Sequence, residues 1–451
     1  MASQDSIGVG MIGCGTVGTG VAQLLQQQAS IRNLEPPMSL RRVLVRDLNK
    51  PRRFQPNLAD EQVSHDHIID RTIFTDDADR FFATDDMPIV IEVAGGSDEV
   101  ASHVRRALRL GKHLVTANKS LLAVEGPHLF DLARRHHVAI AFEASCAAGL
   151  PIITALQFGL SANRIDGLYG ILNGTCNFIL TQMTRNGISY EDALQQAQEL
   201  GYAEADPTLD VSGQDAAQKL TLLASLSFGI NATENAVWFE GIDRLDLSDI
   251  QFGAELGYDI KLLAIARRDS QDHQALSLRV HPAFVHNDLP LAQVRGPFNA
   301  LSVYGHATGH TMYYGRGAGQ MPTASAIVSD LVNMASGWYP TAFIKKKLWS
   351  GDRSAMKIQD RDELVGRYYL RMSTKDVPGV VAQVSKILGD SGISLSALLQ
   401  HEMDAGQFVP VVILTHKARE GSLMRALADI EKLEVINGEP VCIRIVDLPE
   451  E

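Results

Sequence analysis

A glycine pattern near the amino terminus constrains the fold of this 451-residue chain more than any other feature. It reads GCGTVG, follows the apolar run Ile7–Ile12 and leads into a helix pattern over residues 17–25. In a strand–loop–helix setting the first glycine makes a tight turn, the second lets backbone N–H groups approach a pyrophosphate, and the third allows close helix–strand packing. The alternative is a glycine-rich turn without a ligand. The residues predicted to contact a dinucleotide are Gly13, Gly15, Thr16, Val17 and Gly18.

Strand and helix patterns alternate through residues 1–145. Short apolar runs at 42–45, 89–93, 113–116 and 138–142 predict strands, and residues 100–110 predict a helix. Strands interleaved with helices indicate a parallel, doubly wound sheet, the Rossmann arrangement. We expect residues 315–345, a glycine loop followed by a helix pattern, to complete this domain.

The rest of the chain has three kinds of pattern. Residues 146–314 contain a strand pattern at 167–172 and helix patterns at 190–200 and 215–228, and predict an α+β substrate-binding and catalytic domain. Residues 344–362 are polar and basic and predict a linker. Residues 363–451 give the order strand, helix, strand, strand, helix, strand, which is a ferredoxin-like βαββαβ module. The expected fold class is therefore α/β, with three domains.

Charge and cysteine content exclude several classes of protein. Lys and Arg number 41 against 53 Asp and Glu, a formal charge of -12, which disfavours binding to nucleic acid or anionic lipid. The four cysteines form no CxxC pair, so we expect neither a zinc site nor a disulfide framework. We find no signal peptide pattern and no run of 18 uncharged apolar residues, and expect a soluble cytoplasmic protein without a membrane span.

The end of the second predicted strand, Val45-Arg46-Asp47, bears on which nicotinamide dinucleotide is bound. A carboxylate there binds the ribose of NAD, whereas an arginine accommodates the additional phosphate of NADP. Arg46 comes first, and Lys50, Arg52 and Arg53 follow nearby. We therefore favour NADP with NAD tolerated. The alternative is that this basic run is a solvated loop.

Further candidates lie where predicted strands and loops end. Thr116-Ala117-Asn118-Lys119 follows a predicted parallel strand, at the edge where open α/β sheets bind ligands. Burial of a lysine there would lower its pKa and favour proton transfer near neutrality; the alternative is a surface lysine at the start of a loop. Thr116 and Lys119 are cofactor candidates, and Lys119 is also a catalytic candidate. Gly317 and Gly319 precede another predicted helix and either close over the nicotinamide or form a plain turn.

An acidic loop and the helix after it form a second candidate site, which reads GYAEADPTLDVSGQDAAQK over residues 201–219. Asp215 and Lys219 are four residues apart and share a helix face, so Asp215 can hold Lys219 in place. Clustered carboxylates favour either a cationic ligand group, such as the amino group of a substrate, or bound water. An acidic first turn that stabilises the helix dipole is the alternative, but it explains neither Glu204 nor Asp210.

A dinucleotide loop, two lysines suited to proton transfer and an acidic loop together predict a dehydrogenase that acts on an amino-acid alcohol or aldehyde. The chain also resembles homoserine dehydrogenase in six segments, which read GCGTVG, TANKS, FEASCAAGLPII, LNGTCNFIL, GYAEADPTLDVSGQDAAQK and GAGQMPTASAIVSD. The resemblance implies reversible, NAD(P)H-dependent reduction of L-aspartate 4-semialdehyde to L-homoserine, on the route to threonine, methionine and isoleucine.

The resemblance also assigns roles to residues. It implies that Lys219 donates a proton to the aldehyde oxygen and that Lys119 is a second catalytic or cofactor-contacting lysine. The substrate-binding residues that it implies are Asn173, Gly174, Thr175, Tyr202, Glu204, Asp210 and Asp215. It further implies a sodium ion bound mostly by backbone oxygens. The residues that would hold this ion are Glu143, Cys146, Ala148 and Leu150.

The segment YLRMSTKDVPGVVAQV, which starts at Tyr369, resembles an ACT domain, a βαββαβ module that often binds amino acids. Asp376 and Gly379 lie in its Asp-x-Pro-Gly turn and are effector candidates. The resemblance implies feedback by threonine, and a tail that only dimerises is the alternative. The family is usually dimeric or tetrameric, so we expect a homodimer or homotetramer.

Three other functions stay open from the sequence. One is another amino-acid semialdehyde reductase or dehydrogenase. The second is an aldehyde-oxidising enzyme, which would need a nucleophilic cysteine with a nearby base; the candidates are Cys146 and Cys176, and neither has a clear histidine partner in the sequence, which argues against this function. The third is a catalytically silent amino-acid sensor built from the same domains, against which the presence of both lysines and of the acidic loop argues.

Overall fold

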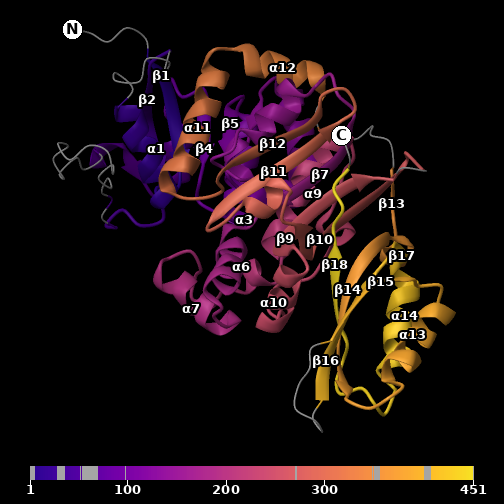
Figure 1. Cartoon of the computed structure of the whole chain (residues 1–451). Coiled ribbons are helices and arrows are strands. Elements are labelled where there is room, and N and C mark those ends of the chain that lie inside the picture. Colours follow the sequence, from indigo (N-terminus) through magenta and orange to yellow (C-terminus); the bar gives the residue numbers. More distant parts are fainter. Residues whose placement is uncertain are drawn as a thin grey trace. The chain divides into compact units, whose positions relative to one another are not determined.

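The computed structural model describes residues 6–27, 36–50, 52, 70–96, 98–269, 272–347, 349, 356–400 and 408–449. The chain divides into two compact units (Figure 1). The first unit comprises Met1–Arg164, Thr221–Glu234 and Tyr313–Ala355, and the second comprises Ile165–Leu220, Asn235–Met312 and Met356–Glu451. Among the described residues, no helix is both long enough and apolar enough to cross a membrane.

A six-stranded parallel sheet in the order β3-β2-β1-β4-β5-β6 forms the centre of the first unit. Its strands are β1 (Ile7–Ile12), β2 (Met38–Leu44), β3 (Phe74–Thr75), β4 (Ile89–Glu92), β5 (His113–Thr116) and β6 (Ile140–Ala141). The strand order reverses between β1 and β4, which is where sheets of this kind bind dinucleotides. Helices on both faces bury such strands, which explains their uninterrupted apolar runs. The predicted Rossmann sheet is confirmed.

The helices of the first unit surround this sheet. They are α1 (Thr16–Gln26), η2 (Arg71–Ile73), α2 (Ala78–Phe82), α3 (Asp98–Arg109), α4 (Lys119–Arg135), η3 (Glu143–Ser145), α5 (Ile152–Thr154), the π-helix η4 (Ala155–Gly159), α11 (Gln320–Ala335) and α12 (Trp338–Lys346). α11 packs directly against α1 (Figure 1), because a Cβ atom on Gly20 would lie only 3.1 Å from the Cβ atom of Ala324. The helix near the end of the unit therefore covers the helix that follows the glycine loop.

The polar segment 344–362, expected to be a linker, contains ordered structure at both ends. α12 extends to Lys346, and Trp349 is only 2% exposed. Its indole packs edge-on against Phe130 and stacks on Phe142, beside Gly126, where a Cβ atom would approach the indole to 3.3 Å. At the other end lie β13 (Lys357–Ile358), which pairs with β10, and η7 (Arg361–Glu363). One buried tryptophan thus anchors a segment whose composition is otherwise that of a solvated connection.

A large mixed sheet forms the second unit, in the order β12-β11-β7-β9-β10-β18-β14-β16-β15. Its long strands are β7 (Ile165–Ile171), β9 (Tyr258–Arg268), β10 (Ala275–His286), β11 (Phe298–Gly305), β12 (Gly309–Arg316), β14 (Val365–Lys375), β15 (Leu395–Gln400), β16 (Phe408–Thr415) and β18 (Val441–Ile445). Short strands β8 (Trp238–Phe239) and β17 (Ala418–Arg419) pair with β10 and β14. The sequence did not predict β9 to β12.

The helices of the second unit flank the predicted acidic loop and form part of the C-terminal module. They include α6 (Gly174–Asn186), α7 (Tyr190–Glu199), α8 (Thr208–Val211), the start of α9 (Gln214–Phe228), α10 (Leu247–Glu255), η6 (Pro290–Gln293), α13 (Val380–Asp390) and α14 (Glu420–Ile430), and η5 (Glu234–Ala236) stands at the unit boundary. The order β14-α13-β15-β16-α14-β18 is the predicted βαββαβ module. Its core packs α13 and α14 against one face of these strands (Figure 1).

The C-terminal module shares its sheet with the strands before it. β18 pairs in parallel with β10, where Ala283 faces Arg444 and Phe284 faces Ile445. Asp249 in α10 is fully buried, and it accepts hydrogen bonds from the Tyr369 hydroxyl (3.0 Å) and from the Arg371 guanidinium (2.6 and 2.8 Å). Within the second unit, the C-terminal βαββαβ module is therefore joined to the strands and helices before it through both backbone pairing and a buried ion pair.

Candidate active site

Asn173 is the residue on which the candidate substrate site converges. It caps α6, because its Oδ1 atom accepts a hydrogen bond from the Cys176 N–H (2.8 Å). Its Nδ2 atom donates to Asp210 Oδ1 (2.7 Å) and to Asp215 Oδ2 (2.8 Å). A side-chain amide has two N–H donors, so Asn173 uses both to hold two carboxylates that would otherwise repel each other.

Lys219 points into the same cluster. Its Nζ atom lies 2.7 Å from Asp215 Oδ2 and donates to the Leu172 carbonyl oxygen (2.8 Å), and its side chain is 12% exposed. The predicted pairing of Asp215 with Lys219 across one helical turn is confirmed. The Leu172 carbonyl also accepts from Asn299 Nδ2 (2.9 Å). The direction of the Lys219 ammonium is therefore fixed by a carboxylate and by the backbone that ends β7.

The charges of this cluster leave one carboxylate without a matching cation. Asp210 and Asp215 carry two negative charges, and Lys219 supplies one positive charge. Burial raises the pKa of Asp210, although the Asn173 hydrogen bond opposes this effect, and the nearby charge of Asp215 raises the pKa further. An ammonium group on a ligand would supply the missing positive charge.

The other predicted substrate residues surround this cluster at different depths. A Cβ atom on Gly174 would lie 2.8 Å from the Pro297 carbonyl oxygen, so only glycine fits there without a shift. Thr175 Oγ1 donates to the Tyr202 carbonyl oxygen (2.7 Å), and the Tyr202 ring packs on Phe178. Glu204 is exposed. Gln198 Nε2 donates a hydrogen bond to the backbone carbonyl oxygen of Glu204 (3.2 Å), which holds this loop in place. The structure thus brings Asn173, Asp210, Asp215 and Lys219 together and leaves Glu204 on the exposed loop.

Two residues of the cluster were not predicted as parts of it. Asn299 comes 127 residues after Leu172 and has no local sequence signal that connects it to the site. Cys176 donates through Sγ to the Asp210 carbonyl oxygen (3.2 Å). Burial, together with the charges of Asp210 and Asp215, raises the pKa of the Cys176 thiol well above its usual range. Cys146 is also fully buried, so neither cysteine is placed as a nucleophilic thiolate, and the aldehyde-oxidising alternative loses its required group.

The glycine loop of the first unit has the geometry that a pyrophosphate requires. Gly13 has φ +91°, and a Cβ atom there would lie 2.7 Å from the Ala94 backbone. A Cβ atom on Gly18 would lie 2.8 Å from the Gly13 carbonyl oxygen. Gly15 is exposed, with nothing within 4 Å of its Cβ position, and it precedes Thr16 and Val17 at the start of α1 without a side-chain cap. The residues therefore fit a dinucleotide, whose phosphates would approach open backbone and a helix N-terminus.

In the loop after β2, Arg46 differs from Asp47 and Arg52 in its contacts. Arg46 is exposed, whereas the Asp47 carboxylate accepts a hydrogen bond from the Asn49 N–H (2.8 Å). Arg52 donates to the Asp47 carbonyl oxygen (2.7 Å) and to the Cys14 carbonyl oxygen (3.3 Å), so it fastens this loop to the glycine loop. Arg53 lies outside the described residues.

Thr116 and Lys119 stand at the carboxyl edge of the parallel sheet. The Thr116 hydroxyl donates to the buried Glu92 carboxylate (2.7 Å), which also accepts from the Ala94 and Gly95 N–H groups. Burial raises the pKa of Glu92. Lys119 is half-buried and opens α4. Lys119 belongs to the first unit and Lys219 to the second.

The second predicted glycine loop stands before α11, in the first unit. The Ala148 N–H donates to the Gly317 carbonyl oxygen (2.9 Å). Gly319 has φ +129° and precedes α11 without a side-chain cap. The loop is therefore fastened at Gly317 to the segment around Ala148, in which the sequence predicted a sodium site.

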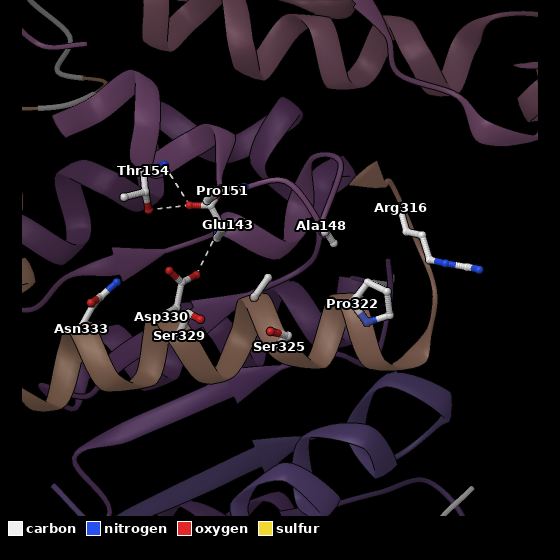
Figure 2. A pocket seen from close by; sticks show the side chains of 12 residues that line it. Glu143, Ala148, Pro151, Thr154, Arg316, Pro322, Ser325, Ser329, Asp330 and Asn333 are labelled. Atoms are coloured by element: carbon white, nitrogen blue, oxygen red, sulfur yellow. Dashed lines mark hydrogen bonds between the residues drawn. The ribbon is translucent and has the colours of Figure 1, made fainter. Parts of the chain in front are cut away.

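That segment lines a pocket of about 480 Å³ in the first unit, shown in Figure 2. The Glu143 carboxylate accepts hydrogen bonds from the Ile153 N–H and from the N–H and hydroxyl of Thr154 (2.5–2.8 Å), and the Glu143 N–H donates to Asp330 Oδ2 (2.9 Å). Burial, together with the charge of Glu143, raises the pKa of Asp330 well above its usual range. Two buried carboxylates thus adjoin the turn that contains Cys146, Ala148 and Leu150.

A pocket of about 370 Å³ in the C-terminal module surrounds the two effector candidates. It is lined by residues 374–381 together with Gln400 and Val411. Asp376 is exposed, and Gly379 has φ +93° at the start of α13. The Asp-x-Pro-Gly turn therefore forms one wall of an open pocket.

A doubly wound sheet with an open glycine loop, in the same chain as a lysine held by a carboxylate and a backbone carbonyl, defines a nicotinamide-dependent oxidoreductase. Comparison with known families specifies which one. Residues 151–332 match the family profile described as homoserine dehydrogenase, residues 13–143 match its NAD-binding domain, and residues 368–432 match the ACT domain.

Full-length relatives agree with these profiles. Homoserine dehydrogenase of Pseudomonas aeruginosa is 40% identical over 98% of this chain and 99% of its own length, and that of Synechocystis sp. is 39% identical over 98% of this chain and 100% of its own. A crystal structure of a homoserine dehydrogenase from Thiobacillus denitrificans is 38% identical, covers 98% of this chain and 99% of that chain, and has a TM-score of 0.86. The chain belongs to the homoserine dehydrogenase family, the NAD(P)-dependent oxidoreductases that act on the CH–OH group of homoserine.

Proposed function

We propose that the Asn173 cluster is the site at which this chain binds L-aspartate 4-semialdehyde and reduces it to L-homoserine. The observation that carries this proposal is that one asparagine side chain, Asn173, binds both Asp210 and Asp215, and that Asp215 in turn binds Lys219. Asp210, with Glu204 on the adjacent loop, binds the substrate ammonium group, because the cluster lacks one positive charge. Thr175 and Tyr202 border the site, and Gly174 lets the chain pass close to Pro297.

The same contacts give Lys219 its role in proton transfer. Its ammonium group is held between Asp215 and the Leu172 carbonyl, so a proton on Nζ has a fixed direction. When bound, the nicotinamide dinucleotide supplies the hydride. Lys219 gives a proton to the oxygen that becomes the homoserine hydroxyl, and it accepts that proton in the reverse direction. Lys119 is a second catalytic or cofactor-contacting lysine in this proposal.

An initial-rate assay with L-aspartate 4-semialdehyde and NADPH tests this function directly. We expect the rate of NADPH consumption to saturate as the semialdehyde concentration rises. With homoserine and NADP the reaction should run in the opposite direction and form NADPH. Aldehydes of similar length that lack the α-amino group should be reduced with a lower kcat/KM, because Asp210 would then have no cation to bind. Absence of turnover at saturating semialdehyde would favour the silent sensor. Equal kcat/KM for both kinds of aldehyde would contradict the role of Asp210.

The preferred dinucleotide in this proposal is NADP, with NAD tolerated. Two observations support this preference. The Asp47 carboxylate already accepts a hydrogen bond from the Asn49 N–H, and Arg46, shortly after the end of β2, is exposed. The ratio of kcat/KM for NADPH to kcat/KM for NADH measures it, and a ratio below one would contradict it.

We also propose a sodium ion at the turn formed by Glu143, Cys146, Ala148 and Leu150. Backbone oxygens suit a hard cation, and a cation bound beside the buried carboxyl groups of Glu143 and Asp330 would favour their charged forms. The Ile152 N–H donates to the Leu150 carbonyl (2.7 Å), whose second lone pair can still face an ion. The melting temperature should be higher in sodium chloride than in choline chloride of equal ionic strength, and equal temperatures would contradict this site.

The pocket of the ACT module is proposed to bind a small amino acid, with threonine as the first candidate. Asp376 offers a carboxylate to an α-ammonium group, and the N-terminus of α13 after Gly379 faces the same pocket wall. Isothermal titration of the full chain with threonine should show binding that the Asp376→Asn variant weakens. If threonine neither binds nor changes the rate, the module serves assembly alone, in a homodimer or homotetramer.

A further inference from the structure

A buried ion network joins the ACT module to the strands that precede it. Arg444 in β18 donates to Glu420 in α14 (2.5 and 3.3 Å) and to Glu240 (3.0 Å), which directly follows β8. Glu420 is fully buried and also pairs with Arg361 (2.6 Å). Burial opposes ionisation of Glu420, but the two arginines outweigh it and lower the pKa of its carboxyl group. The charged, buried Glu420 carboxylate therefore fixes the position of the Arg444 guanidinium.

An aromatic ring completes this anchor. The guanidinium groups of Arg361 and Arg444 each lie 4.3 Å from the centroid of the Trp238 ring, in β8. Cation–π contacts of this kind limit the positions that a guanidinium group can adopt. Glu240 follows this tryptophan by two residues, and 41% of its side chain is exposed. Its contact with Arg444 therefore joins a rigid, buried cation to a carboxylate that water could otherwise solvate.

The residues after Glu240 contact the helix that carries Asp210. The Ile242 N–H donates to the Val211 carbonyl oxygen (2.9 Å), and a Cβ atom on Gly241 would lie only 2.3 Å from that oxygen. Val211 is the residue after Asp210 and the last residue of α8. The Glu240 N–H donates to the Val280 carbonyl oxygen (2.8 Å), which fixes the same segment to β10. A continuous path thus leads from Arg444, through Glu240 and the backbone up to Ile242, to Val211, the residue that follows Asp210.

We propose that Glu240 is a positioning residue for the substrate site, through which Arg444 of the ACT module sets the place of α8 and of the Asp210 carboxylate. The proposal rests on the proposed role of Asp210 in binding the substrate ammonium group. Removing the Glu240 charge leaves Arg444 paired with Glu420, so no buried charge is left alone and the fold is retained. What changes is the restraint on residues 240–242, and with it the position of α8.

The principal test is the full-length Glu240→Gln variant. The KM for homoserine should rise about fivefold, in the range of typical coupling between sites, while kcat and the KM for the dinucleotide stay unchanged. The matched control is Asp447→Asn. Asp447 pairs with Arg367 of the same module at 3.1 Å and is 46% exposed, but its partner contacts Tyr258 rather than the segment that reaches α8. This control should leave the KM for homoserine within twofold of the parent.

Backbone amide exchange gives a readout that is independent of activity. Amides of residues 208–213 should exchange faster in Glu240→Gln than in Asp447→Asn, since the acceptor at Val211 is held less firmly. Arg444→Lys keeps a charge beside Glu420 but has no Nη1 atom to donate to Glu240, so it should raise the same KM. Combined with Glu240→Gln it should raise this KM no further, because the Glu240–Arg444 contact is already lost in either single variant.

The outcomes separate this proposal from the proposed function. If Asp210→Asn leaves the KM for homoserine unchanged, the substrate role of Asp210 fails, whatever Glu240 does. If Asp210→Asn raises that KM but Glu240→Gln neither raises it nor speeds exchange at residues 208–213, the positioning role of Glu240 is overturned alone. Equal effects of Glu240→Gln and Asp447→Asn also overturn it, because they would report a general weakening of the module.

Discussion

The side-chain amide of Asn173 lies 2.7 Å from the carboxylate of Asp210, which comes 37 residues later in the chain. The same amide nitrogen reaches Asp215, whose carboxylate holds Lys219. One neutral side chain therefore keeps two carboxylates close together.

Replacing Lys219 by alanine should lower kcat by about 10²–10⁴-fold, the usual contribution of a general acid. The KM for homoserine should change much less, because Asp210 remains in place. Steady-state rates in both directions measure this split, with Lys432→Ala as the control, since Lys432 is an exposed lysine that pairs with Asp429 in the C-terminal module. A loss in kcat of less than threefold would remove Lys219 from this role.

Replacing Asn173 by alanine should lower the free energy of unfolding by about 2 kcal/mol or more, because it removes a helix cap and both donors to two carboxylates. Ser189→Ala is a matched control, since Ser189 caps α7 through the Asp192 N–H at an exposed position and should cost only about 1 kcal/mol. Urea unfolding measures both variants. Equal losses would show that Asn173 acts as a cap and nothing more.

The pH dependence of homoserine binding should follow Asp210. Burial raises its pKa, so the carboxylate that binds the ammonium group forms only above the ordinary aspartate range, and the KM for homoserine should fall as pH rises through that raised pKa. For folding the sign is opposite. The folded state binds this proton more tightly than the unfolded state, so the contribution of Asp210 to stability decreases as pH rises from the unfolded pKa through the folded one.

A pH profile of the KM for homoserine checks this prediction. In the Asp210→Asn variant the acidic limb of the profile should flatten, and the KM should be high at every pH. A parallel shift of the whole profile without flattening would assign the titration to another group.

Replacing Arg46 by alanine should lower kcat/KM for NADPH more than for NADH, because an arginine at the end of the second strand accommodates the additional phosphate of NADP. Lys386→Ala is the control, since Lys386 is an exposed lysine that pairs with Asp390 in the C-terminal module. Rates with both dinucleotides measure the change in preference. An equal loss for the two would refute the assignment of the phosphate to Arg46.

Much of the dinucleotide domain follows from local sequence. The glycine loop needs a positive φ at Gly13 and close backbone approach at Gly18, and both requirements are visible in the spacing of the glycines. The Asp215–Lys219 pair follows from the helical repeat alone. These features depend on neighbours within one or two turns, and sequence patterns report such neighbours well.

Other features depend on partners distant in the sequence. Strand β9 was missed because it is buried in the middle of its sheet, and its run Leu262-Leu263-Ala264-Ile265-Ala266 is an uninterrupted apolar pattern that also suits a helix. The placement of Trp349, in the polar segment 344–362, depends on its packing against Phe130 and Phe142. The bridge from Asn173 to Asp210 and Asp215 spans 37 and 42 residues, and no local pattern encodes it.

The parallel pairing of β10 with β18 decides where this chain can be recombined with a relative. Exchange of a regulatory module between enzymes is simplest at a flexible junction, but here the foreign module would have to reproduce the register of Arg444 and Ile445 along β10. It would also have to supply donors to the Asp249 carboxylate in place of Tyr369 and Arg371. A working hybrid should therefore take β10 and α10 from the same parent as its C-terminal strands.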